Sequence, residues 1–336
     1  MSAARLHRLG DPLRIESIPT PQPGPGQVVV QVHACGVCHT DVHACRGDWR
    51  AQPTLPLTPG HEIIGDVVAC GSGVSEGLLG ARVGVFWLNG ACQACEYCLD
   101  GWESLCPRQI NTGFGVAGGF AEYVCVQSDF AVPVPPSLDP NMAAPLLCAG
   151  VSAYKAIRET ELLPGASLGI IGCGGVGHLA VAYAKAAGLR VVALDRRDTP
   201  LSLALAQGAD DAIDVRDADA LRRLKKSGGL HGVLVTAASV DAIRLGIDLL
   251  RRKGIAVIVG LPAGDALVPV FDVVVKRFTI RGSIGGCRDD VAATLEIAMR
   301  RSIRPHVEIR KLVDANEALA AVEAGNVLGR VVLTMT

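Results

Sequence analysis

The sequence predicts an α/β protein of two domains, a doubly wound parallel sheet and a mostly antiparallel β domain. A chain of 336 residues has room for about two domains of ordinary size. Residues 13–148 contain short β-rich runs broken by Gly and Pro, which is typical of an irregular antiparallel domain. From residue 151, apolar strands alternate with helical stretches of roughly ten to fifteen residues, which is the pattern of βαβ units.

The β-rich region is expected to form its clearest strands at 27–32 and 62–68, where β-branched residues dominate. In the second region the expected strands are 167–172, 190–195, 232–235, 255–260 and 279–283. The helices between them are expected to begin near Val176, Pro200, Ala218 and Val240.

The tail from residue 286 is expected to contain helices at 291–300 and 315–324 and a last strand at 330–334. We expect this tail to return to the first domain. The predicted domains are therefore 1–150 together with 286–336, and 151–285.

Composition excludes several classes of protein. Lys and Arg number 32 and Asp and Glu 33, so the net charge of -1 provides no cationic field for nucleic acid. The uncharged stretch 165–184 contains six glycines, and no membrane-spanning helix is expected. Residues 1–12 lack the apolar core of a secretory signal.

Twelve cysteines without an export signal indicate a reducing, cytoplasmic location, where clustered thiols more often mark metal or catalytic chemistry than disulfides.

Four of the cysteines fall within fifteen residues, namely Cys92, Cys95, Cys98 and Cys106. Four thiolates at short intervals satisfy tetrahedral zinc and leave no position open for substrate. The run therefore predicts a structural zinc site. An iron–sulfur cluster also takes four cysteines at a different spacing, and Pro107 directly after Cys106 keeps that alternative open.

A second metal site is predicted from Cys38, His61 and Cys148. Two thiolates and one imidazole leave the fourth position of tetrahedral zinc for water or substrate, which is the arrangement of a catalytic zinc. Each residue alone is more often an ordinary core residue. The prediction therefore depends on the set as a whole.

A glycine-rich turn follows the strand expected at 167–172, and Asp195 ends the next strand 23 residues after Gly172. Strand, turn, helix and acid in this register predict a dinucleotide site, since glycines allow the pyrophosphate to approach and the helix N-terminus offers free N–H groups. An acid at Asp195 favours NAD, whereas Arg196 and Arg197 leave NADP open. The residues expected to bind the cofactor here are Gly172, Gly174, Gly175, Val176, Gly177, Asp195 and Arg196.

Together these motifs resemble the zinc-containing alcohol dehydrogenases of the medium-chain dehydrogenase/reductase superfamily, most closely the tetrameric bacterial and yeast type. The resemblance covers nearly the whole chain. Its further carriers are Cys38-His39-Thr40-Asp41, Gly60-His61-Glu62, Trp87-Leu88-Asn89-Gly90, Leu147-Cys148-Ala149-Gly150 and Gly329-Arg330-Val331-Val332-Leu333. It implies a GroES-like catalytic domain at 1–150 and 286–336, a Rossmann NAD-binding domain at 151–285, two zinc ions per chain, and a homotetramer.

The resemblance also implies roles for residues around the catalytic zinc. Cys38, His61 and Cys148 would bind the ion, with Glu62 as an alternative ligand or neighbouring acid. Asp41 would orient His61 through its other ring nitrogen.

Four more residues take roles from the same resemblance. Thr40 and His43 would carry the alcohol proton towards solvent through a ribose hydroxyl, although a helix cap and a surface histidine are the ordinary alternatives. His39 and Arg330 would lie near the cofactor pyrophosphate. The implied reaction is reversible hydride transfer between a primary alcohol or aldehyde and NAD.

Trp49 and Trp87 match positions that narrow the pocket in relatives favouring short primary alcohols, although large aromatics are also common core residues. The sequence departs from the family pattern at two positions. Cys45 lies near the zinc loop, where its thiol is either inert or oxidisable, and Ala117 occupies a position where the family commonly has an acidic residue. A zinc-dependent enzyme of the same family for polyols or for aromatic alcohols or aldehydes, linked to NAD or to NADP, stays open as an alternative. A second alternative is a structural or redox-responsive protein that binds zinc and a dinucleotide. The complete set of metal ligands and the complete proton path argue against it.

Overall fold

A computed structural model describes residues 1–335 and shows two compact units. Unit 1 comprises Met1–Cys148, Gly285–Glu296 and the segment from Pro305 on, and unit 2 comprises Ala149–Ile284 and Ile297–Arg304. Most of the tail thus groups with unit 1. The end of helix α10 (Arg288–Arg301) groups with unit 2, where the Gln207 side chain donates a hydrogen bond to the Arg304 carbonyl at 3.1 Å.

Unit 2 is built on a parallel sheet of six strands. Their order across the sheet is β12 (Asp211–Asp214), β11 (Arg190–Asp195), β10 (Ser167–Ile171), β13 (Leu230–Val235), β14 (Leu250–Ile258) and β15 (Thr279–Gly282). The direction of winding reverses between β10 and β13. Open α/β sheets bind ligands at the carboxyl ends of their strands next to such a reversal.

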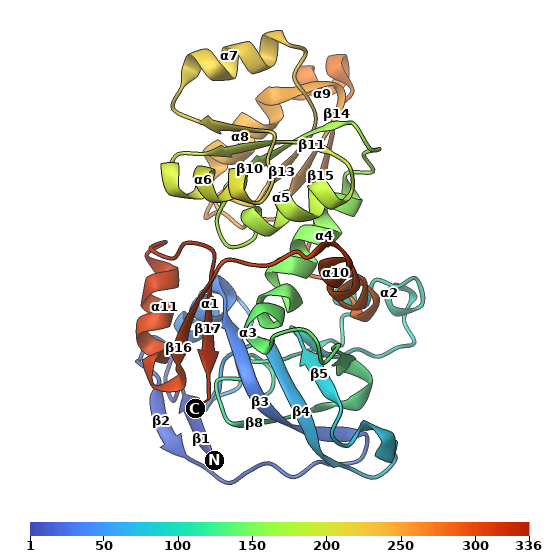
Figure 1. The fold of residues 1–336 in the computed structure, drawn as a ribbon, viewed down its shortest axis with the longest axis vertical. Coiled ribbons are helices and arrows are strands. Elements are labelled where there is room, and N and C mark those ends of the chain that lie inside the picture. Colours follow the sequence, from blue (N-terminus) through green and yellow to red (C-terminus); the bar gives the residue numbers. More distant parts are fainter. Residues whose placement is uncertain (336) are drawn as a thin grey trace. The chain divides into compact units, whose positions relative to one another are not determined.

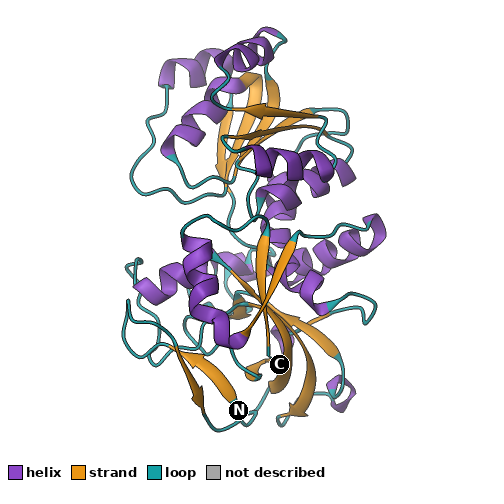
Figure 2. Cartoon of the chain, turned by 60° about the vertical axis from the view of Figure 1, so that its left-hand side comes forward, coloured by secondary structure: helices purple, strands orange, loops and turns teal. Residues whose placement is uncertain are grey.

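Helices lie on both faces of this sheet (Figure 2). They are α4 (Ala149–Glu159), α5 (Gly177–Ala186), α6 (Asp198–Ala206), α7 (Ala218–Lys226), α8 (Val240–Leu249) and α9 (Val270–Lys276). Helix α5 contacts β10 and β11, and α8 contacts β13 and β14. The central strands are accordingly apolar on both sides, with Ile170, Val233 and Leu234 fully buried.

Unit 1 contains a sheet that is antiparallel except for the parallel pair β16 and β17 (Figure 1). Its order is β16 (Val307–Lys311), β17 (Arg330–Thr334), β3 (Gln27–Val37), β4 (Glu62–Cys70), β5 (Arg82–Val85) and β9 (Val132–Pro133), with β8 (Tyr123–Gln127) also paired to β3. The smaller strand pairs are β1 (Ser2–Arg5) with β2 (Arg14–Ser17) and β6 (Leu88–Gly90) with β7 (Ile110–Asn111). Its core includes Leu6, Val30 and Phe120.

The helices of unit 1 are short apart from α10. They are α1 (His39–Arg46), α2 (Glu96–Leu99), α3 (Pro140–Ala143) and α11 (Ala315–Glu323). Single 3-10 turns lie at Glu76–Leu78, Glu103–Leu105, Ser128–Phe130, Ala144–Leu147 and Leu312–Asp314. Within residues 1–335, none of the helices combines the length and apolar character that a bilayer crossing needs.

The structure confirms the strands and helices expected from the sequence to within a few residues and adds others. The elements that were not expected include strands β12 and β16, helices α4 and α9, and most of the short strands and helices of unit 1. Strand β12 reads Asp-Ala-Ile-Asp, so a single buried residue, Ile213, gives no alternation to recognise. Strand β14 begins at Leu250 rather than 255 because the exposed residues Arg251 to Lys253 extend it before its apolar run.

Candidate functional site

Strand register in unit 1 brings distant residues to one edge of its sheet. Strand β3 ends at Val37, directly before Cys38, and β4 begins at Glu62, directly after His61. The two strands are antiparallel with Gly36 opposite Glu62, so Cys38 and His61 become neighbours. On the other side of β3, Val331 of β17 lies opposite Val37, which places Arg330 at the same edge.

Cys148 completes a cluster at this edge. One ligand atom from each of Cys38, His61, Glu62 and Cys148 lies within 4.8 Å of the others. The Sγ atoms of Cys38 and Cys148 are 3.8 Å apart. Two thiolates on a tetrahedral zinc with bonds of about 2.3 Å would be separated by about 3.8 Å. The residues therefore fit the predicted zinc ion in number, chemistry and spacing.

Asp41 holds this cluster in shape through three hydrogen bonds. Its carboxylate accepts from the Cys38 amide at 2.9 Å and the Gly60 amide at 3.1 Å, and lies 3.0 Å from His61 Nδ1. Asp41 and His61 are both 1% exposed. With Nδ1 engaged by the carboxylate, Nε2 is the nitrogen available to a metal, as in carboxylate–histidine–metal triads. The hydrogen bond with Cys148 lowers the pKa of Cys38, which favours the thiolate that binds metal.

Glu62 is a fully buried carboxylate inside the same cluster. Arg330 pairs with its Oε1, but Oε2 has no hydrogen-bond partner in residues 1–335, nor has Arg330 Nε. Burial raises the pKa of Glu62 to about 8, against the opposing effect of the Arg330 guanidinium. A buried carboxylate oxygen without a partner is costly, and a cation at the cluster would satisfy it.

The four-cysteine run forms a second cluster around α2. The Sγ atoms of Cys92, Cys95, Cys98 and Cys106 lie within 4.8 Å of one another. Sγ distances of 3.5 Å and 3.9 Å to Cys98 match ligands of one tetrahedral ion, whereas a cluster of several iron atoms needs a wider cage. Hydrogen bonds from the backbone of Ala94 and Cys95 lower the pKa of Cys92 to about 5. The short Sγ distances and the lowered pKa of Cys92 together favour a structural zinc site.

The glycine-rich turn of unit 2 lies between β10 and α5 and requires glycine at two places. Gly172 has φ of +94°, and a Cβ there would lie 2.8 Å from the Ala237 amide. At Gly177 a Cβ would lie 1.9 Å from the Gly172 carbonyl oxygen, so only glycine lets the helix start against the strand. Gly174, Gly175 and Val176 between them are partly exposed.

Asp195 sits at the carboxyl end of β11 beside this turn. It accepts hydrogen bonds from the Cys173 amide at 2.8 Å and the Arg197 amide at 3.1 Å, and is 8% exposed. Arg196 is exposed next to it. The structure therefore brings the predicted acid and the predicted turn together.

An aromatic group in unit 1 lies beside His61, in the cluster that includes Cys38, Glu62 and Cys148. The rings of Trp49 and Trp87 are 6.1 Å apart, and that of Trp87 is 5.3 Å from His61. Phe114 contacts both indoles at 5.4 and 5.9 Å. Sequence reasoning missed Phe114, because a phenylalanine between two glycines has no periodicity that would distinguish it from a core residue.

Helix α1 carries the residues expected to handle the proton. The Thr40 amide donates to Cys38 Sγ at 3.5 Å, and the rings of His39 and His43 are 5.2 Å apart. His43 faces Asp48 and Trp49. Cys45 is buried on the same helix, and burial raises its pKa to about 12, which favours the inert alternative for this thiol.

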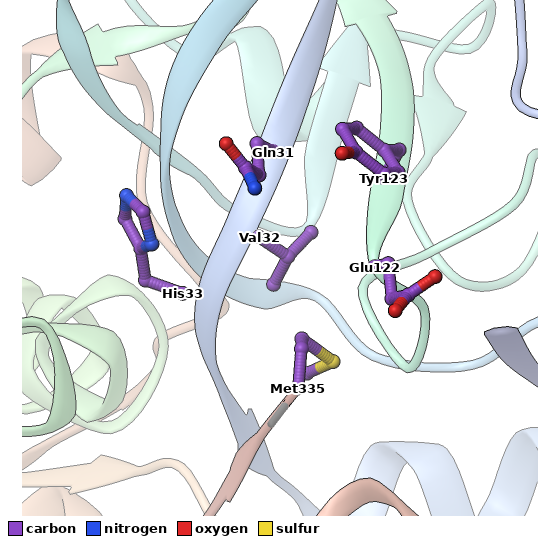
Figure 3. Close-up of a pocket in the computed structure, with 6 residues that line it drawn as sticks. All are labelled: Gln31, Val32, His33, Glu122, Tyr123 and Met335. Atoms are coloured by element: carbon purple, nitrogen blue, oxygen red, sulfur yellow. The ribbon is translucent and has the colours of Figure 1, made fainter. Parts of the chain in front are cut away.

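A hollow of about 200 Å³ opens elsewhere in unit 1, beside strands β3 and β8 (Figure 3). Its lining includes His33, Glu122, Tyr123 and Met335. None of the eight residues of the two metal clusters lines it. This hollow is therefore not the site described above.

Comparison with known proteins agrees with the geometry. Residues 24–136 match the family described as alcohol dehydrogenase GroES-like domain, and residues 175–300 match the family described as zinc-binding dehydrogenase. An alcohol dehydrogenase from Rhizobium meliloti (strain 1021) is 46% identical over 100% of this chain and 99% of its own.

Solved structures have the same fold. The alcohol dehydrogenase of the hyperthermophilic archaeon Aeropyrum pernix superimposes with a TM-score of 0.91 at 33% identity over 100% of both chains. The acetophenone reductase of Geotrichum candidum NBRC 4597, in complex with NAD, gives 0.89 at 29% identity over 99% of this chain and 97% of its own. The chain belongs to the zinc-containing alcohol dehydrogenases of the medium-chain dehydrogenase/reductase superfamily.

Proposed function

We propose that this alcohol dehydrogenase uses NAD, holds two zinc ions per chain and converts small primary alcohols reversibly to aldehydes, as a homotetramer. The observation that carries the proposal is the cluster of Cys38, His61, Glu62 and Cys148, whose spacing suits one tetrahedral ion. The cytoplasmic location expected from the cysteine content stays a prediction.

Cys38, His61 and Cys148 are proposed to hold the catalytic zinc, and Glu62 to stand beside it as an alternative ligand. A zinc ion held by these residues would supply a Lewis acid that lowers the pKa of an alcohol oxygen, and NAD would supply the hydride acceptor. The chain's own contribution is orientation. Asp41 fixes the His61 ring, and the apolar indole of Trp87 excludes water beside it.

The alcohol proton is proposed to leave by way of Thr40, a ribose hydroxyl and His43. Thr40 lies two residues after Cys38, and its amide hydrogen bond to Cys38 Sγ keeps it close to the cluster. His43 follows one helical turn later and is about one-third exposed, so it can pass a proton to water.

NAD is favoured over NADP by the environment of Asp195. Its carboxylate is held at the end of β11 by two amide groups, and a fixed negative charge there repels a 2′-phosphate. The NAD complex of the Geotrichum candidum relative supports the same choice. His39 and Arg330 are proposed to contact the pyrophosphate, for which the unpartnered Arg330 Nε offers a donor.

Substrate size is proposed to be set by the aromatic group of Trp49, Trp87 and Phe114. Three large rings within 6.1 Å of one another leave little room next to His61. Linear primary alcohols fit such a space better than branched or polyhydroxylated ones.

Assembly is proposed to use the edge of the unit 2 sheet. Strand β15 ends that sheet, and the surrounding segments expose large apolar side chains. These include Leu267, Val270, Phe271 and Val274, each at least 68% exposed. An apolar patch beside a sheet edge is typical of a subunit interface.

Replacing a catalytic ligand should remove one zinc ion and the activity together. We expect Cys38→Ser to lower turnover at least about 100-fold and to reduce the zinc content from two ions per chain to one, since thiolate ligands supply most of the affinity. Metal analysis by mass spectrometry and steady-state rates measure both. Cys70→Ser, a thiol on β4 outside both clusters, is the control. Unchanged zinc and turnover in Cys38→Ser would show the assignment to be wrong.

Cofactor preference tests the role of Asp195. We expect kcat/KM to be at least about 100-fold higher with NAD⁺ than with NADP⁺, and Asp195→Ser to reduce that ratio about tenfold or more by removing the repelling charge. Asp214→Asn, at the end of the neighbouring strand β12, is the matched control. A wild-type enzyme that prefers NADP⁺ would contradict the proposal.

A substrate panel tests the aromatic group. Ethanol and butanol should give higher kcat/KM than benzyl alcohol or sorbitol, and Trp49→Ala should raise the rate with benzyl alcohol relative to ethanol about tenfold. Trp102→Ala, outside the aromatic group, should leave the ratio unchanged. A preference for sorbitol would be incompatible with a narrow apolar pocket.

The mass in solution tests the interface. Light scattering should give four chain masses, and Phe271→Asp should shift the protein towards smaller species, because a charge in an apolar interface is costly. Leu205→Asp, an exposed leucine on α6, which contacts β11 and β12 at the other end of the sheet, should leave the assembly intact. A wild-type monomer would disprove the proposed assembly.

A further inference from the structure

His43 has a carboxylate partner that the reaction scheme above does not use. Its Nδ1 lies 2.8 Å from the Asp48 carboxylate. The amide groups of Gly47 and Asp48 both donate to the His43 carbonyl, at 3.0 and 3.2 Å. This turn at the end of α1 directs the chain back, so that Asp48 returns to the histidine five residues before it.

The turn is fixed by glycine at position 47. Gly47 has φ of +76°, and a Cβ there would lie 2.7 Å from Leu9 Cδ1 and 3.0 Å from Gln52 Oε1. Only glycine adopts this conformation in this space without strain. The position of Asp48 is therefore determined by the local fold, unlike that of a long side chain in a chance surface ion pair.

The contact decides which nitrogen of His43 carries the proton. If Nδ1 were unprotonated, two acceptors would face each other at 2.8 Å unless Asp48 itself were protonated. An aspartate carboxylate carries no proton and can only accept hydrogen bonds. Nδ1–H therefore donates to Asp48, and the neutral ring leaves Nε2 free.

We propose that Asp48 is a positioning residue that, by accepting the Nδ1 proton of His43, makes Nε2 the nitrogen that takes up the alcohol proton. The inference rests on the proposed function, because it assigns a nitrogen to its proton path. In that role Nε2 would gain the proton passed on from Thr40 when the cofactor is bound, and the ring would become a cation paired with Asp48. Nε2 would then release the same proton to water, so that the ring returns to its starting form.

Among the charged groups near His43, Asp48 is the one that stabilises a positive charge on the ring. His39 stands 5.2 Å away between ring centres and opposes a positive charge on His43. Arg46, on the same helix, is paired with Glu323 of α11. The side chains of His43 and Asp48 are 33% and 42% exposed, so solvent weakens the attraction between them without removing the hydrogen bond.

The first experiment reads His43 without turnover. Diethyl pyrocarbonate acylates neutral imidazole, and fragment-ion mass spectrometry of the zinc-loaded enzyme follows His43 alone at each pH. The pH at half-maximal acylation should fall by about 0.5 in Asp48→Asn, because the cation loses its partner. It should stay unchanged in Asp48→Glu and in Glu323→Gln, whose carboxylate pairs with Arg46 instead. Equal midpoints in wild type and Asp48→Asn would overturn the proposal.

The second experiment is a double-mutant cycle in kcat/KM against pH. Asp48→Asn should move the acidic limb to lower pH by about 0.5 and lower the plateau about threefold, since a weaker base accepts the proton less readily. In a His43→Gln background, Asp48→Asn should change neither, because Asp48 acts through His43. An equal loss in both backgrounds would show a merely structural role and overturn the proposal.

The two experiments separate this inference from the proposed function. An enzyme inactive on every alcohol disproves the proposed function, while the acylation midpoint still reports whether Asp48 acts on His43. If the enzyme is active but His43→Gln leaves its pH profile unchanged, His43 does not carry the alcohol proton, and the inference is overturned.

Discussion

The register between β3 and its two neighbours is the constraint on which the proposed catalytic site depends. Because β4 and β17 both run antiparallel to β3, residues more than 260 positions apart in sequence, such as Glu62 and Arg330, meet at one sheet edge. A shift by one residue would turn each side chain to the opposite face and disperse the cluster. Cys38 and His61, two of the proposed zinc ligands, are thus positioned by the many backbone hydrogen bonds between β3 and β4 rather than by contacts within the site.

The site also concentrates buried charge in a way that an apolar core would not tolerate. Two thiols, two carboxylates, an imidazole and a guanidinium lie close together, and Asp41 and Glu62 are almost without exposure. Asp41 satisfies its charge with two amides and a ring nitrogen, whereas Glu62 keeps one oxygen unpartnered. A divalent ion would balance this excess of negative groups, so the metal would contribute to the stability of the fold as well as to its chemistry.

Much of the fold and the site can be predicted from the sequence because the signals are local. The four-cysteine run, the glycine-rich turn and the strands that flank it are contiguous, and the structure brings their members together as expected. What depends on tertiary contact cannot be predicted in the same way. Phe114 joins Trp49 and Trp87 only after three separate loops converge, and strand β12 has too few apolar residues to show a period.

Asp41 links two parts of the site that are usually considered separately. The same carboxylate that holds His61 also accepts the Cys38 amide at the start of α1, in a capping box. The helix that carries Thr40 and His43 is therefore capped by the same carboxylate that orients His61, the proposed metal ligand. A substitution at Asp41 would therefore disturb His61 and the start of α1 at the same time. Redesign of the metal ligands would have to keep Asp41, or rebuild the start of α1 together with the ligand set.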